Sequence, residues 1–198
     1  MNHLGHAETT HLSHWNGDHS DALVKADKDM IHISVKAMKI TWGSDGRFWS
    51  WIQLPKDKLP KDLSKDEVGF DSAAELLQVS WLEVTGALDL ANHKHQLSPS
   101  KTYEVIYHIK FKADAFGFSK VPITLLLVTP DGKREKISEM METHRNRGVD
   151  LWHEIYGGEF RVPATVTGKV EFGVLEVESQ RWKGGMIFAG VTIRPKMD

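Results

Sequence analysis

The amino-acid sequence predicts an all-β fold, an antiparallel β-sandwich or jelly roll with one short helix. Seven to nine short segments alternate apolar and polar residues with the period of a strand. Clusters of Gly, Pro, Asp and Ser, which are typical of turns, separate these segments. The sequence shows no regular alternation of strands with long helices, which a parallel sheet would require. We therefore expect two antiparallel sheets that pack on each other.

The first predicted strand begins at residue 31. Ile31, Ile33 and Val35 alternate with polar residues, and residues 40–42 extend the apolar pattern. The segment Gly-Ser-Asp-Gly at 43–46 is a strong turn signal, because Gly and Asp adopt the backbone angles that tight turns need. This part of the chain therefore predicts a strand followed by a turn.

A loop and a short helix are expected next. Residues 55–71 contain two prolines and many charged residues, which predicts an exposed loop. Ser72 and Glu75 have the spacing of a capping box, in which each side chain bonds an unpaired amide at the start of a helix. We expect this helix to cover residues 73–78 and to lead into a strand at 79–84.

The middle of the chain holds the clearest strand signals. Residues 103–111 alternate apolar and mostly polar side chains, as a half-buried strand does. Residues 122–128 form a dense apolar run, and Thr-Pro-Asp-Gly at 129–132 ends it as a turn. The charged residues 133–147 follow, and a short strand is expected around residues 151–156.

The acidic strand near the C-terminus has an irregular pattern. Residues 170–178 alternate, but the phase of the apolar positions slips at 174–175. A β-bulge there would restore one buried face and would turn three glutamates to the same outer face. These glutamates are Glu171, Glu176 and Glu178. Residues 186–193 predict the last strand.

Composition and charge limit the functional classes. The chain has 198 residues, a formal net charge of -2 and no cysteine. Without cysteine, disulfides, thiol catalysis and Cys-ligated metal sites are excluded. The small net charge gives no overall attraction to nucleic acid or to an anionic membrane. No apolar stretch reaches the ~18 residues that a membrane span needs, and we see no secretory signal, so we expect a cytosolic protein.

The first 30 residues differ from the rest. They are polar, and they hold five of the 11 histidines, namely His3, His6, His11, His14 and His19. This composition predicts a flexible polar, His-rich extension at 1–30 and a folded domain at 31–198. The two His-x-x-His spacings would bind a metal ion only opportunistically, because no second shell of acidic partners is fixed nearby. We therefore expect neither a bound metal nor a cofactor.

The tryptophans are the main candidates for ligand binding, and the chain has seven of them. Trp42, Trp49 and Trp51 flank the first turn, and Trp182 lies in a second turn-rich segment. Indole rings at the ends of a sandwich offer flat, stiff surfaces on which the C–H face of a sugar can stack. The alternative is that the first three close one end of the core. Trp81 lies within an apolar segment and is expected to pack in the core.

The acidic strand raises a second alternative, hydrolysis of a glycosidic bond. That reaction needs two carboxyl groups at a fixed separation, one of them with a raised pKa. Glutamates on the outer face of a strand are usually solvated, so we expect no enzymatic activity. Sequence motifs of serine hydrolases, zinc proteases and phosphate-binding loops are also absent.

Five segments in a fixed order carry the most specific signal. They are Lys39-Ile-Thr-Trp-Gly-Ser-Asp-Gly-Arg-Phe-Trp-Ser-Trp51, residues 74–86, residues 97–111, residues 170–178 and residues 182–196. In this order they resemble the motifs of the plant phloem protein 2 family, which includes the Nictaba-type lectins. The resemblance covers roughly residues 36–196.

The resemblance implies a non-catalytic lectin. Its expected ligands are GlcNAc oligomers such as chitin fragments, and the GlcNAc-containing cores of N-glycans. It implies a cytoplasmic or nucleocytoplasmic protein of the phloem sap that forms a homodimer and acts in defence or the wound response. It also implies that Trp42, Trp49 and Glu176 matter for sugar binding, while Trp182 could extend the platform to a second sugar.

Two positions depart from the family pattern. Lys169 stands where the family has a second glutamate, and Gly184 replaces the serine of a common Trp-Lys-Ser-Gly turn. The first departure is expected to affect how sugar hydroxyls are recognised. The resemblance also leaves an alternative function, that of an RNA-binding or filament-associated phloem transport protein with a secondary sugar site.

Overall fold

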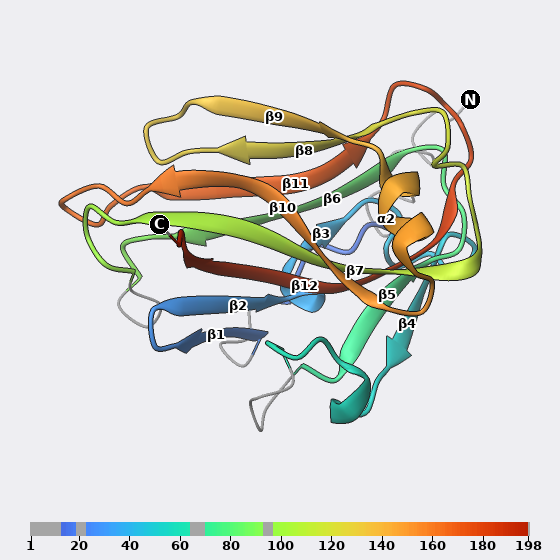
Figure 1. Cartoon of the computed structure of the whole chain (residues 1–198), viewed down its shortest axis with the longest axis horizontal. Helices are drawn as coiled ribbons and strands as arrows, with labels where there is room; N and C mark the ends of the chain where they lie inside the picture. The colour runs from blue at the N-terminus through green and yellow to red at the C-terminus, as the bar shows by residue number, and fades with distance from the viewer. Residues whose placement is uncertain (1–12, 19–22, 64–69, 93–96, 198) are drawn as a thin grey trace, which may run out of the picture.

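Two antiparallel sheets pack face to face in the computed structural model, which describes residues 13–18, 23–63, 70–92 and 97–197 (Figure 1). One sheet has seven strands and the other has five. The predicted all-β sandwich is therefore confirmed. The described residues form twelve strands, more than the seven to nine expected, because several short pairings have no clear sequence period.

The seven-stranded sheet is centred on the last strand, β12 (Gly184–Pro195). One side of β12 pairs with the long strand β7 (Thr102–Phe116). The other side pairs with β2 (Met30–Ser34) and, nearer its start, with β5 (Ser72–Leu76). Three further strands complete the sheet: β1 (Val24–Asp27) beside β2, β4 (Trp49–Gln53) beside β5, and β10 (Trp152–Arg161) beside β7.

The five-stranded sheet covers the other side of the core. Its strand order is β3 (Lys39–Ile40), β6 (Leu82–Asp89), β11 (Lys169–Glu176), β8 (Ile123–Val128) and β9 (Arg134–Glu139). Short 3-10 turns, η2 (Val35–Ala37) and η3 (Lys56–Lys58), and the helix α2 (Met141–Arg147) connect strands. Strand β9 and helix α2 arise within the charged stretch 133–147, where β9 is fixed by its backbone pairing with β8.

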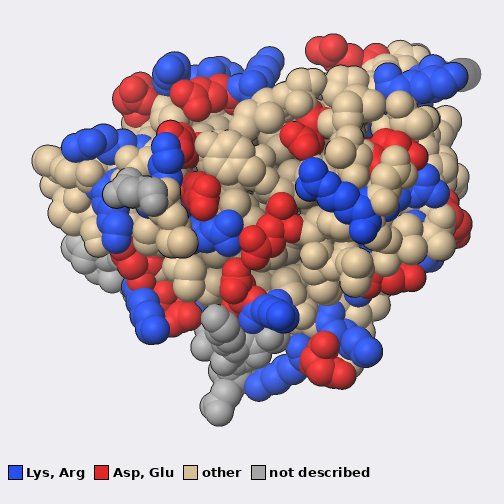
Figure 2. All heavy atoms as spheres, in the orientation of Figure 1, with Lys and Arg blue, Asp and Glu red and all other residues tan. Residues whose placement is uncertain are grey.

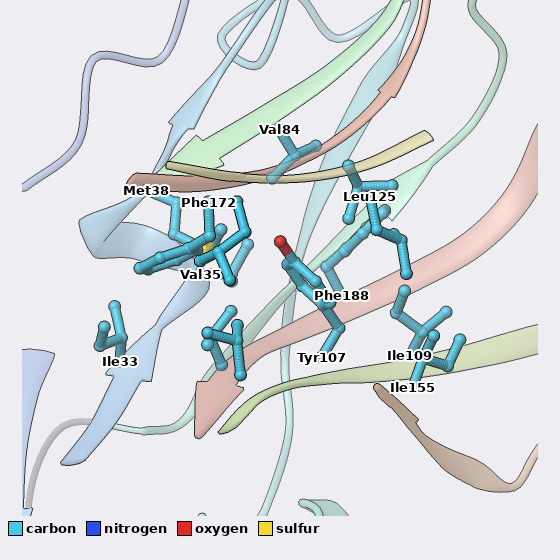
Figure 3. Close-up of a cluster of buried hydrophobic side chains, with 14 of the residues drawn as sticks. Ile33, Val35, Met38, Val84, Tyr107, Ile109, Leu125, Ile155, Phe172 and Phe188 are labelled. Carbon is cyan, nitrogen blue, oxygen red and sulfur yellow. The ribbon is translucent and has the colours of Figure 1, made fainter. Parts of the chain in front are cut away.

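Apolar side chains from both sheets fill the space between them (Figure 3). Phe172 of β11 and Val84 of β6 come from the five-stranded sheet, and Tyr107, Ile109 and Phe188 come from the other. All five are buried. Burying a side chain of this size stabilises the fold by about 1.5–3 kcal/mol relative to exposing it. This core holds the two sheets at a fixed distance and so fixes the loops at each end.

The prediction of a helix at 73–78 is wrong. Residues 72–76 form β5, which is paired with β4 on one side and β12 on the other. Ser72 donates its hydroxyl hydrogen to Asp71 and caps no helix. Ala73 and Ala74 are fully buried, and their small side chains suit a strand at the centre of a sheet. Tertiary pairing therefore overrides the local capping signal.

The prediction of a β-bulge at 174–175 is also wrong. Strand β11 keeps one register with β6 from Lys169 to Glu176, and it pairs without interruption with β8. The inward face therefore continues past Val174 to Glu176, whose side chain is buried, while Glu171 points outward. The apparent phase slip arises because a buried glutamate occupies an inward position that sequence patterns assign to apolar residues.

The segment 55–71 is not simply an exposed loop. Leu59, Leu63 and Phe70 are buried, although η3 itself is exposed, and residues 64–69 lie outside the described part. The Trp152 indole N–H donates to the carbonyl of Lys58 and ties this segment to β10. The two prolines therefore interrupt regular structure without preventing burial.

Two described parts of the predicted extension contact the sandwich. The backbone of Trp15 forms a two-way β-bridge with Ile40, and β1 pairs with β2. His14 is described below, and the other four histidines of this segment lie outside the described residues. A flexible extension at 1–30 remains a prediction. In the described chain, no helix has both the length and the apolar character that crossing a membrane requires.

Candidate functional site

Aromatic residues from three loops meet at the end of the sandwich where β11 ends and β12 begins, on the right in Figure 1. They line a small pocket of about 160 Å³. Its lining residues are Trp42, Phe48, Val79, Ser80, Trp81 and Trp182. The structure thus brings two of the predicted sugar-binding residues, Trp42 and Trp182, into one site.

Trp42 is held in an unusual backbone conformation. Its φ angle is 64°, the left-handed region that costs an L-residue roughly 1–2 kcal/mol. The Trp42 amide donates to Nδ1 of His14 at 3.0 Å, and the two rings meet edge to face at 5.1 Å. Phe48 contacts the Trp42 ring at a centroid distance of 5.8 Å. Strain that the surroundings maintain in this way is typical of functional sites.

Trp182 and Trp81 present the most open rings of the pocket. Trp182 is 54% exposed, and its ring stacks on Phe48 at 6.5 Å with an interplanar angle of 28°. Trp81 is 45% exposed, so the expectation that it packs in the core is wrong. Its indole N–H donates to Oε2 of Glu83 at 2.7 Å, which fixes the ring direction. Two half-exposed indoles therefore face solvent from neighbouring loops.

A buried ion pair lies beneath these loops. Nζ of Lys183 lies 2.8 Å from Oε2 of Glu176, and the two side chains are only 0% and 4% exposed. The amide of Ser179 donates to the other oxygen, Oε1, at 3.1 Å. Burial alone would raise the pKa of Glu176, but the hydrogen bonds from Lys183 and Ser179 outweigh it and hold that pKa below its ordinary value. Glu176 is therefore an ionised residue with its oxygens engaged inside the protein.

The same lysine sets the position of both exposed tryptophans. Nζ of Lys183 donates to the carbonyl of Ser80 at 2.9 Å and to that of Arg181 at 2.7 Å. These residues directly precede Trp81 and Trp182 in the chain. The backbones of Val79 and Lys183 also form a two-way bridge. Lys183 thus joins the two loops through two carbonyls and has Glu176 as its counter-ion.

Trp49 and Trp51 do not line the pocket. Trp49 is 2% exposed and packs against Phe188 in the core, as the core-closing alternative expects. Trp51 is half-buried; it contacts the ring of Trp15 at 4.9 Å and donates to the carbonyl of Gly43 at 3.0 Å. The Trp51 indole therefore supports the turn from which Trp42 projects, whereas the Trp49 indole belongs to the core.

The geometry of the acidic strand does not match a hydrolytic pair. Glu171 lies on the outer face of β11 and pairs with Lys169 at 2.9 Å, whereas Glu176 faces inward. The lowered pKa of Glu176 is the opposite of what a general acid needs. Lys169 lies at the far end of β11, seven residues or about 23 Å from Glu176, and does not line the pocket.

His144 is the buried histidine of helix α2. Its Nε2 lies 2.6 Å from Oε1 of Glu139, so the ring is held inside the protein. His93 and His95 lie outside the described residues. In the described part of the chain, no group of three or more His, Asp or Glu side chains is placed to hold a metal ion.

Besides assigning Trp81 to the core, sequence reasoning did not single out Phe48, Glu83 or Lys183. The position of each of these residues in the sequence points to the site only once the fold is known. Phe48 and Lys183 adjoin the tryptophans of two motif segments, and Glu83 stands two residues after Trp81, on the side of a strand that the tryptophan shares.

Known proteins resemble this chain along most of its length. The family model described as phloem protein 2 matches residues 28–195 of this chain. Phloem protein 2-like A1 of Arabidopsis thaliana is 33% identical over 164 residues, covering 83% of this chain and 61% of that protein. Phloem protein 2-like A2 of the same plant is 38% identical over 125 residues, covering 62% of this chain and 60% of that protein.

A lectin of Luffa acutangula is 27% identical over 172 residues, covering 86% of this chain and 73% of the lectin. The chain spans about 60% of the length of the two Arabidopsis relatives. The expected resemblance is confirmed by a match that runs through both sheets and both motif loops of the aromatic pocket. The chain belongs to the phloem protein 2 family.

Proposed function

We propose that this protein is a carbohydrate-binding lectin and that its aromatic pocket recognises GlcNAc oligomers and the cores of N-glycans. The observation that carries the proposal is the pair of half-exposed indoles, Trp81 and Trp182, held in place by one buried lysine. Exposed tryptophans of a folded domain need a reason, and a stacking ligand supplies one. Membership of a family that includes a protein named as a lectin adds independent support.

In this proposal the rings contact the apolar face of the sugar. Trp42, Phe48 and Trp182 line the pocket as a connected series of rings, and Trp81 lines it as well. Glu83 supplies a carboxylate beside the pocket; its Oε2 accepts from Trp81, and its Oε1 has no partner among the described residues. A charge-assisted hydrogen bond from a sugar hydroxyl to Oε1 would be worth about 1.5–3 kcal/mol.

Trp49 and Glu176 act indirectly in the same proposal. Trp49 anchors β4, the strand that follows the turn carrying Trp42, in the core, and Glu176 neutralises the lysine that fixes Trp81 and Trp182. Both residues are therefore positioning residues, and their loss would lower sugar affinity without removing a contact to the sugar.

The test is calorimetric titration of chitotriose into the wild type and two variants, Trp182→Ala and Trp81→Ala. Each variant should lose about tenfold or more in affinity, because it removes one stacking surface. Tyr156→Ala is the matched control, since Tyr156 is an exposed aromatic residue that does not line the pocket. Wild-type affinity in both tryptophan variants would refute the site. Cellotriose, which lacks the acetamido groups, tests the preference for GlcNAc.

We also propose that the protein hydrolyses no glycosidic bond. The engaged, ionised state of Glu176 and the outward pairing of Glu171 support this view. Incubation with chitotetraose followed by product analysis should return only the intact tetramer. Sustained release of shorter oligomers that scales with protein concentration would contradict it.

We further propose a cytoplasmic location in the phloem sap and a homodimer, in which two pockets raise avidity on polymeric ligands. Roles in defence or the wound response belong to the same proposal. RNA binding is the less supported alternative, because Lys and Arg side chains alternate with Asp and Glu over the face shown in Figure 2. Such interleaving differs from a continuous basic track for phosphates.

A further inference from the structure

An exposed phenylalanine continues the aromatic surface beyond the pocket. Phe116, the last residue of β7, is 45% exposed, and it does not line the pocket itself. A large apolar side chain left open beside a ligand site marks a candidate contact surface. Its neighbours show which way the ring faces.

Phe116 stands directly opposite Gly184 in the pairing of β7 with β12. Gly184 has no side chain, and a Cβ added there would lie 2.7 Å from Cε1 of Phe116 and 2.1 Å from the carbonyl oxygen of Leu77. The phenyl ring thus occupies the space that a side chain at 184 would fill. The glycine that replaces the family's serine is what lets Phe116 lie against β12.

Trp182 projects to the same side as Phe116. Side chains alternate along extended backbone, and Lys183, between Trp182 and Gly184, points into the interior. Trp182 stands just before the start of β12, two residues from Gly184, so the exposed side chains of Trp182 and Phe116 lie at the same end of the sheet. The backbones also touch, because a Cβ on Gly117 would lie 2.3 Å from the carbonyl oxygen of Trp182.

We infer that Phe116 forms a second sugar subsite next to Trp182, so that the site prefers a linear oligosaccharide whose neighbouring rings stack on the two residues. This inference rests on the proposed function. Each of the two exposed side chains would give one ring of a linear sugar chain a surface to stack on. Phe116 thereby determines preference for ligand length, while Trp182 and Trp81 are needed for ligands of any length.

The size of the exposed surface favours a sugar over a second copy of this chain. Trp81, Trp182 and Phe116 are each about half exposed, and aromatic side chains of 150–250 Å² therefore offer roughly 100 Å² each. Their total of roughly 300 Å² is well below the ~800 Å² per partner of a stable protein interface. Two or three stacked pyranose rings need no larger area.

The experiment titrates GlcNAc, chitobiose, chitotriose and chitotetraose into the full-length wild type and four variants, Phe116→Ala, Phe116→Trp, Trp182→Ala and Leu151→Ala. Leu151 is the control, as an exposed apolar residue that lies outside the aromatic surface. Phe116→Ala should lower affinity about five- to tenfold for the longer oligomers and leave that for GlcNAc unchanged. Trp182→Ala should weaken every ligand, and Phe116→Trp should restore the length preference.

The outcomes separate the two proposals. If the wild type binds none of the sugars, the proposed function fails. If the wild type binds but Phe116→Ala reduces affinity equally at every length, or not at all, the subsite is refuted while the pocket stands. If Phe116→Ala instead converts a dimer to a monomer in sedimentation and keeps its affinity for free oligomers, Phe116 belongs to an interface and the inference is overturned.

Discussion

The exposed rim of the aromatic pocket and the buried support beneath it use the same residue types in opposite ways. The rim consists of Trp42, Trp81 and Trp182, which come from three loops and line one pocket open to solvent. The support consists of Trp49 and the Glu176–Lys183 pair, which are almost fully buried. A tryptophan or a glutamate in a motif therefore has no fixed role. Its role depends on which side of the sheet its position faces.

This difference separates two kinds of mutational effect. Under the proposed function, loss of the Trp81 or Trp182 side chain removes a ligand contact and leaves the fold intact, because these rings are about half exposed. Loss of a support side chain destabilises the fold and displaces the rim, because Lys183 holds the carbonyls of Ser80 and Arg181. Both changes weaken binding, and only the free energy of unfolding tells them apart.

The largest expected effect comes from breaking the buried ion pair. Lys183→Met should lower the free energy of unfolding by about 3–5 kcal/mol, because it leaves Glu176 buried without its cation. Sugar affinity should fall as well, since two loop carbonyls lose their shared donor. Urea denaturation monitored by far-UV circular dichroism measures the first quantity, and titration of chitotriose measures the second.

A second lysine–glutamate pair on the same strand provides the control. Lys169 pairs with Glu171 at 2.9 Å, but those side chains are 59% and 43% exposed. Lys169→Met should therefore cost less than about 1 kcal/mol. Equal losses in the two methionine variants would mean that burial of the pair does not matter, and the division into rim and support would fail.

The two tryptophan positions give a smaller contrast. Trp49→Phe should lower the free energy of unfolding by about 1–2 kcal/mol, because the smaller ring leaves a void beside Phe188. The cost is moderated because the Trp49 indole N–H meets no acceptor among the described residues, so its removal loses no hydrogen bond.

The matched change on the rim, Trp182→Phe, should alter stability by less than about 0.5 kcal/mol, since that ring is more than half exposed. Thermal or urea denaturation of the two variants side by side measures the contrast. A larger stability loss at Trp182 than at Trp49 would reverse the assignment of rim and support.

The sequence predicts the fold class well because strands and turns have local signals. The alternation at 103–111 is typical of a strand with a polar and an apolar face, and the apolar run at 186–193 is typical of a strand buried on both faces; both lie within described strands. The segment at 72–76 was open to two interpretations. Its capping box favours a helix, but pairing with β4 and β12 makes it a strand, and no local pattern contains that information.

The site is harder to predict than the fold. Sequence motifs place Trp42 and Trp182 near each other only through the family resemblance. An indole is apolar enough for the core and flat enough for a ligand, so sequence alone cannot separate the buried Trp49 from the exposed Trp81. Glu176 is interpreted as outward-facing because its buried partner, Lys183, is seven residues away and belongs to another strand segment.

The smallest expected effect is a pH dependence of the free energy of unfolding, which arises from Glu176 in the buried support. The pKa of Glu176 is lowered in the folded protein from its ordinary value of 4.5. Above pH 4.5 the carboxyl is ionised in both states, and its stabilising contribution is fully present. As the pH falls below 4.5, the unfolded chain binds a proton first, so the free energy of unfolding decreases until the folded carboxyl also binds one.

Glu176→Gln removes this step, although it also destabilises the protein at neutral pH by leaving Lys183 without its counter-ion. Other carboxylates with lowered pKa values, such as Asp29, are present in both proteins, so the difference between the two stability curves isolates Glu176. Urea denaturation between about pH 7 and pH 3 should show the curves parallel above 4.5 and converging below it. Parallel curves down to the lowest pH would mean that the pKa of Glu176 is the same in the folded and unfolded states, and the ion pair would lose its place in the support.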